Sequence, residues 1–447
     1  MKSDTKQLPE WYHVTTLSNF VRGYDKYKGR YSKTDISQST FPDQFFLLKK
    51  DELSIGVSKA KRLIKKIGLD GDRLIALKTH VVEDQMLRDH ESGVAQYIPQ
   101  NYIELDSVYF VESEENNKTP RLVPVRIEDV VARSFEVIDN TLIPWDQLSP
   151  RTVSVLPIAM ACQASCKFCF SKASASSDFE GRISDWDKIT SVLKSAKDAG
   201  AERAVISGGG EPTLLKRDQL VRLVGECASQ FNKVVLITNG HLFGKMPKEK
   251  RLEALSGLDQ AGLSVLAISR HHHDVKQNAQ IMGLDTKTEE VINTLRAHKD
   301  SFKNLSPRFI CVLQDEGIAN VEDIENYLSW SAGQGVTQIN FKELYVSTSN
   351  ESAFSDLAAN DYSAKHQVPL KIVHDFALKH AWEKVAQLPW GAPIYKGEWD
   401  GKVMQIAAYT EPSVYWERTN GVARSWNLMS DGTTLASLED PLSKVCP

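Results

Sequence analysis

The sequence predicts an α/β protein with a partial (β/α)6 barrel at its centre, a small N-terminal α+β domain and a C-terminal cap. From about residue 151 to about residue 346, six short apolar runs alternate with amphipathic stretches of helical period. Strands that alternate with helices form a parallel sheet, and six such units suit an open barrel. Before and after this region the sequence does not show the alternation.

The six apolar runs are the predicted strands of the core. In chain order they are TVSVLPIAM, AERAVISG, KVVLITNG, LSVLAISR, RFICVLQ and TQINFKELYV. Between the first two, SDWDKITSVLKSAKDAG predicts a helix. We expect it to begin at Ser184 as N-cap, with Asp187 three residues on, and to end at Gly200.

The flanking segments have other patterns. Residues 1–112 predict the α+β domain, with strands at DRLIALKTHVV and IELDSVYFVE and a basic helix from Ser58 to Gly68. Residues 113–150 read as a linker and lead-in. Residues 347–447 predict the cap, which begins with the loop-like SNESAFSDLAANDYSAKHQ. One or two helices around PLKIVHDFALKHAWEKVAQ and short strands follow it.

Composition limits the class of protein. The chain has 447 residues, a net charge of −4 and 41% hydrophobic residues, which indicates a soluble protein of two or three domains. This charge gives no sign of general nucleic-acid binding, although the basic stretch from Lys59 to Lys66 can contact phosphates locally. The N-terminal residues lack the apolar core of a secretory signal, and no apolar run approaches the roughly 18 residues of a membrane span. We therefore expect a cytoplasmic protein that does not act at a membrane.

Three of the six cysteines lie together in ACQASCKFCF, directly after the first predicted strand. Cys162, Cys166 and Cys169 have the spacing CxxxCxxC. Thiolates are soft ligands that suit zinc, copper(I) or iron–sulfur clusters. A closed zinc site needs four ligands, whereas three thiolates on a four-iron cluster leave one iron open for reaction. A zinc site or a chance cluster of cysteines is the alternative.

Three motifs in order resemble those of the radical SAM superfamily. They are CxxxCxxC with Phe168 before its last cysteine, GGGEP at Gly208–Pro212, and ITNG at Ile237–Gly240. The resemblance covers about residues 151–346. It implies a [4Fe–4S] cluster on the three cysteines, with an open iron that binds S-adenosylmethionine. It also implies reductive cleavage to a 5′-deoxyadenosyl radical, which removes a hydrogen atom from the substrate. The residues that it assigns to the cofactor are Phe168, Gly209, Gly210, Glu211, Pro212 and Asn239.

Other polar groups follow the later strands, where barrel enzymes build their active sites. The resemblance implies that Ser269 contacts the ribose of the cofactor. Three histidines, His271, His272 and His273, come next, and an imidazole there can bind an anionic substrate or move a proton. A solvated turn is the alternative. Gln314 and Asn340 can face the ribose or adenine, with ordinary strand-end polarity as the alternative.

Two weaker resemblances concern the ends of the chain. The tail SWNLMSDGTTLASLED is similar to hairpins of SPASM and twitch extensions, which bind auxiliary clusters. Ala436 and Ser437 stand where those hairpins carry cysteines, so no auxiliary cluster is expected. Near the other end, WYHVTTLSNF resembles the start of DarT-like ADP-ribosyltransferase domains, with His13 as the matching residue. We find no matching catalytic glutamate, which favours a recognition domain without catalysis.

The sequence thus predicts a cytoplasmic radical SAM enzyme that acts as an oxidoreductase or rearranges its substrate. We expect a metabolite, nucleotide or peptide as substrate, and a flavodoxin or ferredoxin as electron donor. One alternative is a bifunctional enzyme that also transfers ADP-ribose. Another is a nucleic-acid- or peptide-binding protein whose cluster is structural. Release of 5′-deoxyadenosine is required by the first two and excluded by the last.

Overall fold

The computed structural model describes residues 143–170, 183, 185–347, 352–354, 357–412 and 414–446, together with seven strands between residues 11 and 125. The chain divides into two compact units, Met1–Leu142 and Ile143–Pro447. The first unit extends beyond the predicted boundary at residue 112. The predicted cap, residues 347–447, lies in the same unit as the core.

The described part of the first unit is a seven-stranded antiparallel sheet in the order β2-β3-β6-β5-β1-β4, with β7 paired to β6. The two strands expected from the sequence are present as β5 and β6. His13 lies in β1, opposite Leu47 of β4 and Leu77 of β5. The basic helix expected at Ser58–Gly68 lies outside the described residues, and the resemblance of this unit to ADP-ribosyltransferases stays a prediction. The strands are β1 (Trp11–Thr16), β2 (Tyr24–Asp25), β3 (Arg30–Ser32), β4 (Phe46–Lys49), β5 (Leu74–Thr79), β6 (Tyr102–Glu112) and β7 (Arg121–Val125).

All six predicted core strands are present, parallel and in chain order. Each strand lies within the apolar run that predicted it or overlaps that run, because these runs supply the buried side chains of a sheet covered by helices. The strands are β9 (Val153–Val155), β10 (Ala204–Ile206), β11 (Val234–Thr238), β12 (Val265–Ser269), β13 (Ser306–Leu313) and β14 (Gln338–Glu343).

Two further parallel strands extend this sheet, which corrects the expectation that the alternation ends near residue 347. β17 (Lys402–Tyr409) pairs with β14, and β19 (Trp426–Leu428) pairs with β9 on the opposite side. Antiparallel strands then continue the sheet at both ends: β16 (Pro393–Trp399) and β15 (Glu383–Gln387) beyond β17, and β20 (Thr434–Leu435) beyond β19. The expected hairpin in the tail is therefore present as β19 and β20, but its first strand is part of the core sheet.

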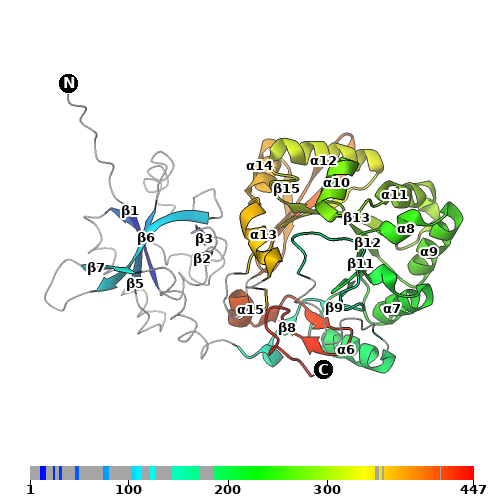
Figure 1. The fold of residues 1–447 in the computed structure, drawn as a ribbon, viewed down its shortest axis with the longest axis horizontal. Helices are drawn as coiled ribbons and strands as arrows, with labels where there is room; N and C mark the ends of the chain where they lie inside the picture. The colour runs from blue at the N-terminus through cyan, green and yellow to red at the C-terminus, as the bar shows by residue number, and fades with distance from the viewer. Residues whose placement is uncertain are drawn as a thin grey trace. The chain divides into compact units, whose positions relative to one another are not determined.

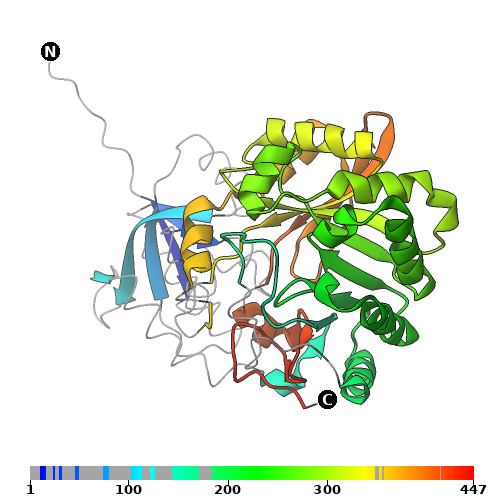
Figure 2. The same cartoon turned by 45° about the vertical axis from the view of Figure 1, so that its right-hand side comes forward.

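Helices connect the strands and lie along the sheet (Figures 1 and 2). α6 begins after Asp185, whose side chain accepts a hydrogen bond from Lys188 N at 2.9 Å, so the N-cap lies one residue later than predicted at Ser184. It ends as predicted, just before Gly200 with φ +113°. The helices are α6 (Trp186–Asp198), α7 (Arg217–Gln230), α8 (His241–Lys245), α9 (Lys248–Gln260), α10 (Val275–Met282), α11 (Thr288–Ala297), α12 (Val321–Gln334), α13 (Ala358–His366), α14 (Lys371–Lys379) and α15 (Val414–Asn420).

The region after residue 347 is more helical than expected. α13 occupies part of the stretch that was predicted as a loop, and α14 is the helix expected near residue 371. The second half of the expected helical stretch is the edge strand β15. A short parallel pair, β8 (Ser149–Pro150) and β18 (Val422–Ala423), ties the start of the unit to the segment before β19.

The two faces of the sheet have different surroundings. The main core lies between the strands and the helices and includes Val155, Leu236 and Phe341. A smaller apolar layer on the other face contains Val235, Val265 and Ala267, with Ile310 packed against them. We call this second face the inner face.

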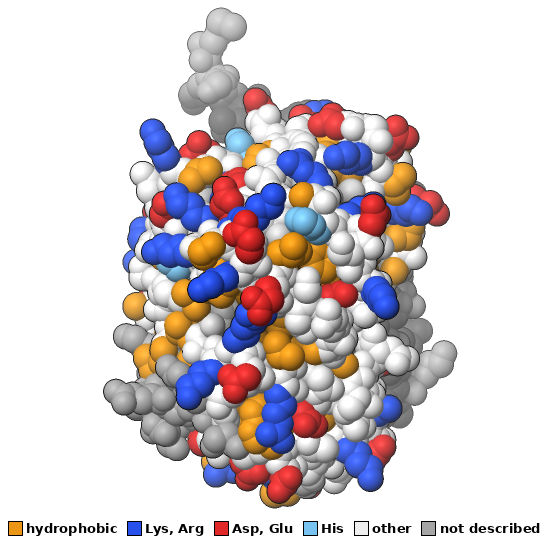
Figure 3. Space-filling model, turned by 90° about the vertical axis from the view of Figure 1, so that its right-hand side faces the viewer, with side chains coloured by type: hydrophobic (Ala, Val, Ile, Leu, Met, Phe, Trp, Pro, Cys, Tyr) orange, Lys and Arg blue, Asp and Glu red, His pale blue; other side chains and the backbone are white. Residues whose placement is uncertain are grey.

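The exposed surface carries both signs of charge. On the face shown in Figure 3, Lys and Arg side chains alternate with Asp and Glu, and neither sign gathers into a patch. None of the described helices is long and apolar enough to cross a bilayer.

Candidate active site

The cysteine loop follows β9 at the carboxyl end of the sheet. Cys162 and Cys169 are exposed and Cys166 is half-buried, and none of them forms a disulfide. Ala164 N approaches Cys162 Sγ at 3.4 Å. Burial raises the pKa of Cys162, and burial together with the neighbouring thiols raises that of Cys166 to about 12. Binding of a metal to these thiols must therefore displace protons.

The glycines of GGGEP let this motif lie directly against the start of the cysteine loop. Gly210 N donates to Ile158 O at 3.0 Å, and Glu211 N donates to Ala161 O at 2.8 Å. A Cβ on Gly209 would lie 2.0 Å from Ala159 O, and one on Gly210 would lie 2.2 Å from Ala161 O. Glycine is thus required at both positions by close backbone packing.

Glu211 is 4% exposed and connects GGGEP to the end of β11. Its Oε1 accepts hydrogen bonds from Thr213 Oγ1 and Thr238 Oγ1, each at 2.6 Å, and from Thr213 N at 3.1 Å. Its Oε2 accepts from Asn239 N at 2.9 Å. A buried carboxylate needs such donors to offset its loss of hydration. In this structure, Glu211 therefore fixes two motifs relative to each other.

Asn239 extends the same network to the cysteine loop. Its Oδ1 accepts from His241 N at 2.9 Å, which orients the side chain. Its Nδ2 lies 3.3 Å from Gln163 Oε1 and 3.7 Å from Cys162 Sγ. Gly240, with φ +74°, then turns the chain into α8. The three motifs identified in the sequence thus meet at one place.

The end of α10 supports the cysteine loop from another side, which the sequence did not predict. Ser165 N donates to Met282 O at 2.9 Å. Gly283 follows with φ +58°, and a Cβ there would lie 2.0 Å from Ser165 Oγ. A glycine that ends a helix carries no local signal of this second, long-range contact.

His271 is buried and contacts the loop through an aromatic pair. Its ring lies edge-on to Phe168 with 5.2 Å between the ring centres, and its Nδ1 accepts from Val312 N at 3.1 Å. Burial, with a smaller contribution from the Arg270 guanidinium, lowers the pKa of His271 to about 3. The ring is therefore neutral near pH 7 and holds the end of β13 beside the cysteine loop.

We expect this histidine to make stability depend on pH. Between about pH 6.5 and about pH 3, the unfolded chain binds a proton on His271 that the folded chain does not bind, so the free energy of unfolding falls as pH is lowered. His271→Gln removes this proton uptake. Guanidinium denaturation at pH 7 and pH 5 should show a smaller difference in the variant than in wild type. Equal differences in the two proteins would contradict this account.

The residues around His271 face different surroundings. Ser269 is half-buried at the end of β12. Arg270 is fully buried, forms an ion pair with Glu289 at 2.9 Å and donates to His272 O and His273 O. His272 Nδ1 accepts from Asp274 N at 3.0 Å, and its ring stacks on that of His273. Within the described residues, His273 Nδ1 is buried without a hydrogen-bond partner.

Gln314 and Asn340 lie on neighbouring strands of the sheet or just after them. Gln314 is buried, and its Oε1 accepts from Tyr362 Oη of α13 at 2.9 Å. Its Nε2 is buried without a partner in the described part of the chain. Asn340 is half-buried and alternates with Ile339 and Phe341, whose side chains belong to the main core. Asn340 therefore points to the inner face.

Aromatic residues from the C-terminal third of the unit complete the surroundings of the loop. Phe170, directly after Cys169, stacks on Phe354 with 4.5 Å between the ring centres and lies edge-on to Tyr345. Tyr345 donates to Glu439, which also accepts from Ser347 Oγ at 2.9 Å. No local pattern predicts these contacts, because they join residues far apart in the chain.

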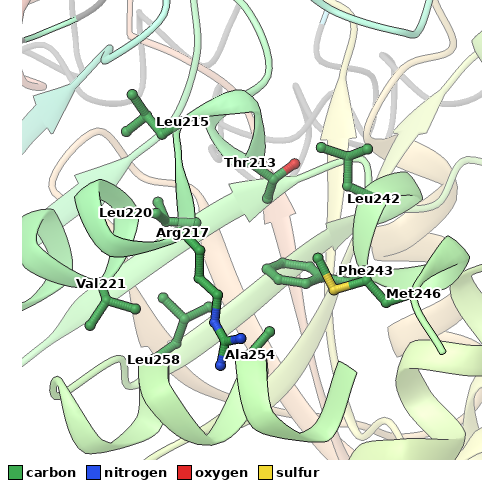
Figure 4. Close-up of a pocket in the computed structure, with 10 residues that line it drawn as sticks. All are labelled: Thr213, Leu215, Arg217, Leu220, Val221, Leu242, Phe243, Met246, Ala254 and Leu258. Carbon is green, nitrogen blue, oxygen red and sulfur yellow. The ribbon is translucent and has the colours of Figure 1, made fainter. Parts of the chain in front are cut away.

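A pocket of about 120 Å³ lies behind GGGEP in the helix layer (Figure 4). Thr213 connects it to the Glu211 network. Its lining is mostly apolar and comes largely from α7, α8 and α9, so it is separate from the strand ends that carry the cysteines. The lining residues are Thr213, Leu215, Arg217, Leu220, Val221, Leu242, Phe243, Met246, Ala254 and Leu258.

The donor set of the cysteine loop fits an iron–sulfur cluster, because thiolates are soft ligands. A four-iron cluster binds each of three thiolates at a different iron and leaves the fourth iron open. Three thiols, two of them exposed, in a loop fixed from several sides match this requirement.

Comparison with known proteins agrees with this reading. Residues 156–328 match the model of the Radical SAM superfamily. No curated protein matches the chain. The matched segment begins directly after β9, includes the cysteine loop and runs through β13 into α12, so this part of the chain is a radical SAM domain.

Three solved structures are among those to which this chain is similar. SuiB of Streptococcus suis bound to S-adenosylmethionine has 16% identity and a TM-score of 0.41, over 69% of this chain and 65% of that chain. The structure of anSMEcpe with bound AdoMet has 12% identity and a TM-score of 0.37, over 64% of this chain and 74% of that chain. Coproporphyrinogen III oxidase (HemN) from Escherichia coli has 13% identity and a TM-score of 0.34, over 53% of this chain and 54% of that chain. At these identities the similarity does not extend to the substrate. Residues 156–328 are thus the part of the chain that belongs to the Radical SAM superfamily, whose members use a [4Fe–4S] cluster and S-adenosylmethionine.

Proposed function

We propose that this chain cleaves S-adenosylmethionine reductively and removes a hydrogen atom from a small-molecule or peptide substrate. The observation that carries the proposal is the meeting of the three-cysteine loop, GGGEP and Asn239 at the carboxyl ends of β9, β10 and β11. When bound, the cluster and S-adenosylmethionine supply a 5′-deoxyadenosyl radical. The electron comes from a donor such as flavodoxin or ferredoxin.

The protein's residues hold and orient these groups. Cys162, Cys166 and Cys169 would bind the cluster. The polar backbone of Gly209–Pro212, with Asn239, would face the methionyl end of S-adenosylmethionine. Phe168, Ser269, Gln314 and Asn340 are the proposed contacts of its nucleoside end. The unpartnered Nε2 of Gln314 supports this proposal, because a buried donor without an acceptor is costly.

The histidines after β12 have different proposed roles. His271 holds Phe168 and the end of β13, because its Nδ1 is occupied and its pKa of about 3 keeps it neutral. His272 Nδ1 is also occupied. His273, with a free Nδ1 in the described structure, is the one that we propose for the substrate side. All six cysteines are free, which fits the predicted cytoplasmic location.

The test is a turnover assay without added substrate. The protein is reconstituted anaerobically with iron and sulfide, reduced with dithionite and mixed with S-adenosylmethionine. We expect about four irons per chain and slow release of 5′-deoxyadenosine, measured by liquid chromatography. Omission of dithionite should abolish the release. A protein that binds four irons and S-adenosylmethionine but releases no 5′-deoxyadenosine under reducing conditions would favour a structural cluster instead.

A further inference from the structure

A charged group that the sequence did not single out lies on the inner face of the sheet. Ile339 and Phe341 of β14 belong to the main core, and Glu343 Oε1 accepts from Leu370 N, so these residues face the helices. Lys342 alternates with them and therefore faces the other side. Its Nζ lies 5.7 Å from the ring centre of Tyr409, its neighbour on β17.

Lys342 shares one carboxylate with an arginine from a distant segment. Lys342 Nζ lies 2.5 Å from Glu411 Oε1, and Arg424 forms an ion pair with Glu411 Oε2. Glu411 follows the carboxyl end of β17, and Arg424 precedes β19. The group thus connects segments next to the two ends of the parallel run. The side chains of Lys342, Glu411 and Arg424 are 32%, 16% and 25% exposed, so solvent and small solutes reach them.

The balance of charge in direct contact is positive. Two cations contact one carboxylate. Glu417 lies nearby and accepts from Arg424 N, and burial raises its pKa well above the usual range, which favours its neutral form. The carboxylate of Glu439 accepts from three hydroxyl groups, those of Tyr345, Ser347 and Ser352. In the described structure, neither of these acids contacts the side-chain nitrogens of Lys342 or Arg424.

Lys342 is a cation despite its surroundings. Burial and the Arg424 guanidinium lower its pKa to about 8, and the Glu411 carboxylate at 2.5 Å favours the ammonium form. Lys342 is the last residue but one of β14, so it lies at the carboxyl end of that strand, the edge of the parallel sheet that the cysteine loop follows at β9.

The fold itself does not require the second cation. The neighbouring part of the inner face is apolar, and removal of a charge from water is costly unless it is paired. One cation would satisfy Glu411 and still join the two segments. A second cation with a partly exposed side chain on the inner face of the sheet instead offers a place for another anion.

We propose that Lys342 and Arg424 bind an anionic group, a carboxylate or a phosphate, of the substrate, with Glu411 holding the two cations in place. This inference rests on the proposed function, since it concerns the substrate of the same site. Arginine suits the planar, two-pronged recognition of such anions, and lysine adds a point charge. Lys342 would bring the anionic group to the carboxyl end of β14, the edge of the sheet at which the hydrogen atom would be removed.

The experiment uses the reconstituted holoprotein saturated with S-adenosylmethionine, so that the site of the cofactor's own carboxylate is filled. Binding of acetate, inorganic phosphate and neutral acetamide is measured by the broadening of their proton or phosphorus resonances. We expect acetate or phosphate to bind and acetamide not to bind. Lys342→Met and Arg424→Met should each weaken anion binding ten-fold or more, which corresponds to about 1.4 kcal/mol. Lys342→Arg should retain it.

Lys396→Met is the matched control, because Lys396 is an exposed lysine of β16. It should bind the anions like wild type. Iron content and 5′-deoxyadenosine release are measured on the same samples. If wild type binds no iron or releases no 5′-deoxyadenosine, the proposed function is wrong, whatever the result for anion binding. The inference is overturned if wild type binds neither anion, or if Lys342→Met and Arg424→Met bind both as wild type does. The inference is also overturned if Lys342→Met and Arg424→Met bind the anions like wild type but change the cluster signal in electron paramagnetic resonance. That result would assign the two cations to the cluster.

Discussion

Replacement of Cys162, Cys166 and Cys169 together by alanine is expected to remove the cluster and abolish 5′-deoxyadenosine release. Among the six cysteines only these three lie in one loop, whereas Cys227 and Cys311 are buried in a helix and a strand. Without thiolates the loop offers no soft ligand to iron. Iron after anaerobic reconstitution should fall from about four per chain to near zero. Release should fall by more than about 100-fold.

Cys446→Ala is the control, since Cys446 is an exposed thiol outside the loop. It should keep the iron and the activity of wild type. About four irons in the triple variant would show that other residues hold the cluster. About eight irons in wild type would show that the tail binds an auxiliary cluster after all, against the expectation drawn from Ala436 and Ser437.

Substitution of Gly209 or Gly210 by alanine is expected to damage the site through backbone displacement. The new Cβ would lie about 2 Å from a carbonyl oxygen of the segment Ala159–Ala161, so that segment must move. Overpacking of this kind costs about 1–3 kcal/mol of stability. Because the segment leads into Cys162, we expect 5′-deoxyadenosine release to fall ten-fold or more, beyond what the loss of folded protein explains.

Gly225→Ala provides a matched control in the same domain. Gly225 lies within α7, and a Cβ there would meet no atom within 4 Å. Alanine in a helix interior is favoured over glycine by roughly 0.5–1 kcal/mol, so this variant should be as stable as wild type or more so. Thermal unfolding and the assay of 5′-deoxyadenosine release should distinguish Gly209→Ala and Gly210→Ala from Gly225→Ala. Gly209→Ala and Gly210→Ala proteins with wild-type activity would mean that the loop adapts without cost.

Features of this protein that depend on neighbours in the chain could be predicted from the sequence. The six core strands follow from short apolar runs, and the end of α6 follows from Gly200, because periodicity and turn residues act over a few positions. The cysteine spacing and the two strand-end motifs identified the superfamily for the same reason. Parallel strands in chain order place their carboxyl ends at one edge, so the meeting of these motifs was also predictable.

Features that depend on contacts between distant segments became visible only in the folded structure. β17 and β19 join the sheet through pairing with β14 and β9, and no β–α alternation in the sequence around them indicates that they are core strands. Glu211 accepts four hydrogen bonds, two of them from Thr238 and Asn239 of the next strand-end motif, which its position in GGGEP does not reveal. Lys342, Glu411 and Arg424 come from three separate segments. Such contacts form only when the chain packs. The local sequence pattern allows many distant segments as partners, and side-chain burial and strand pairing decide which of them are used.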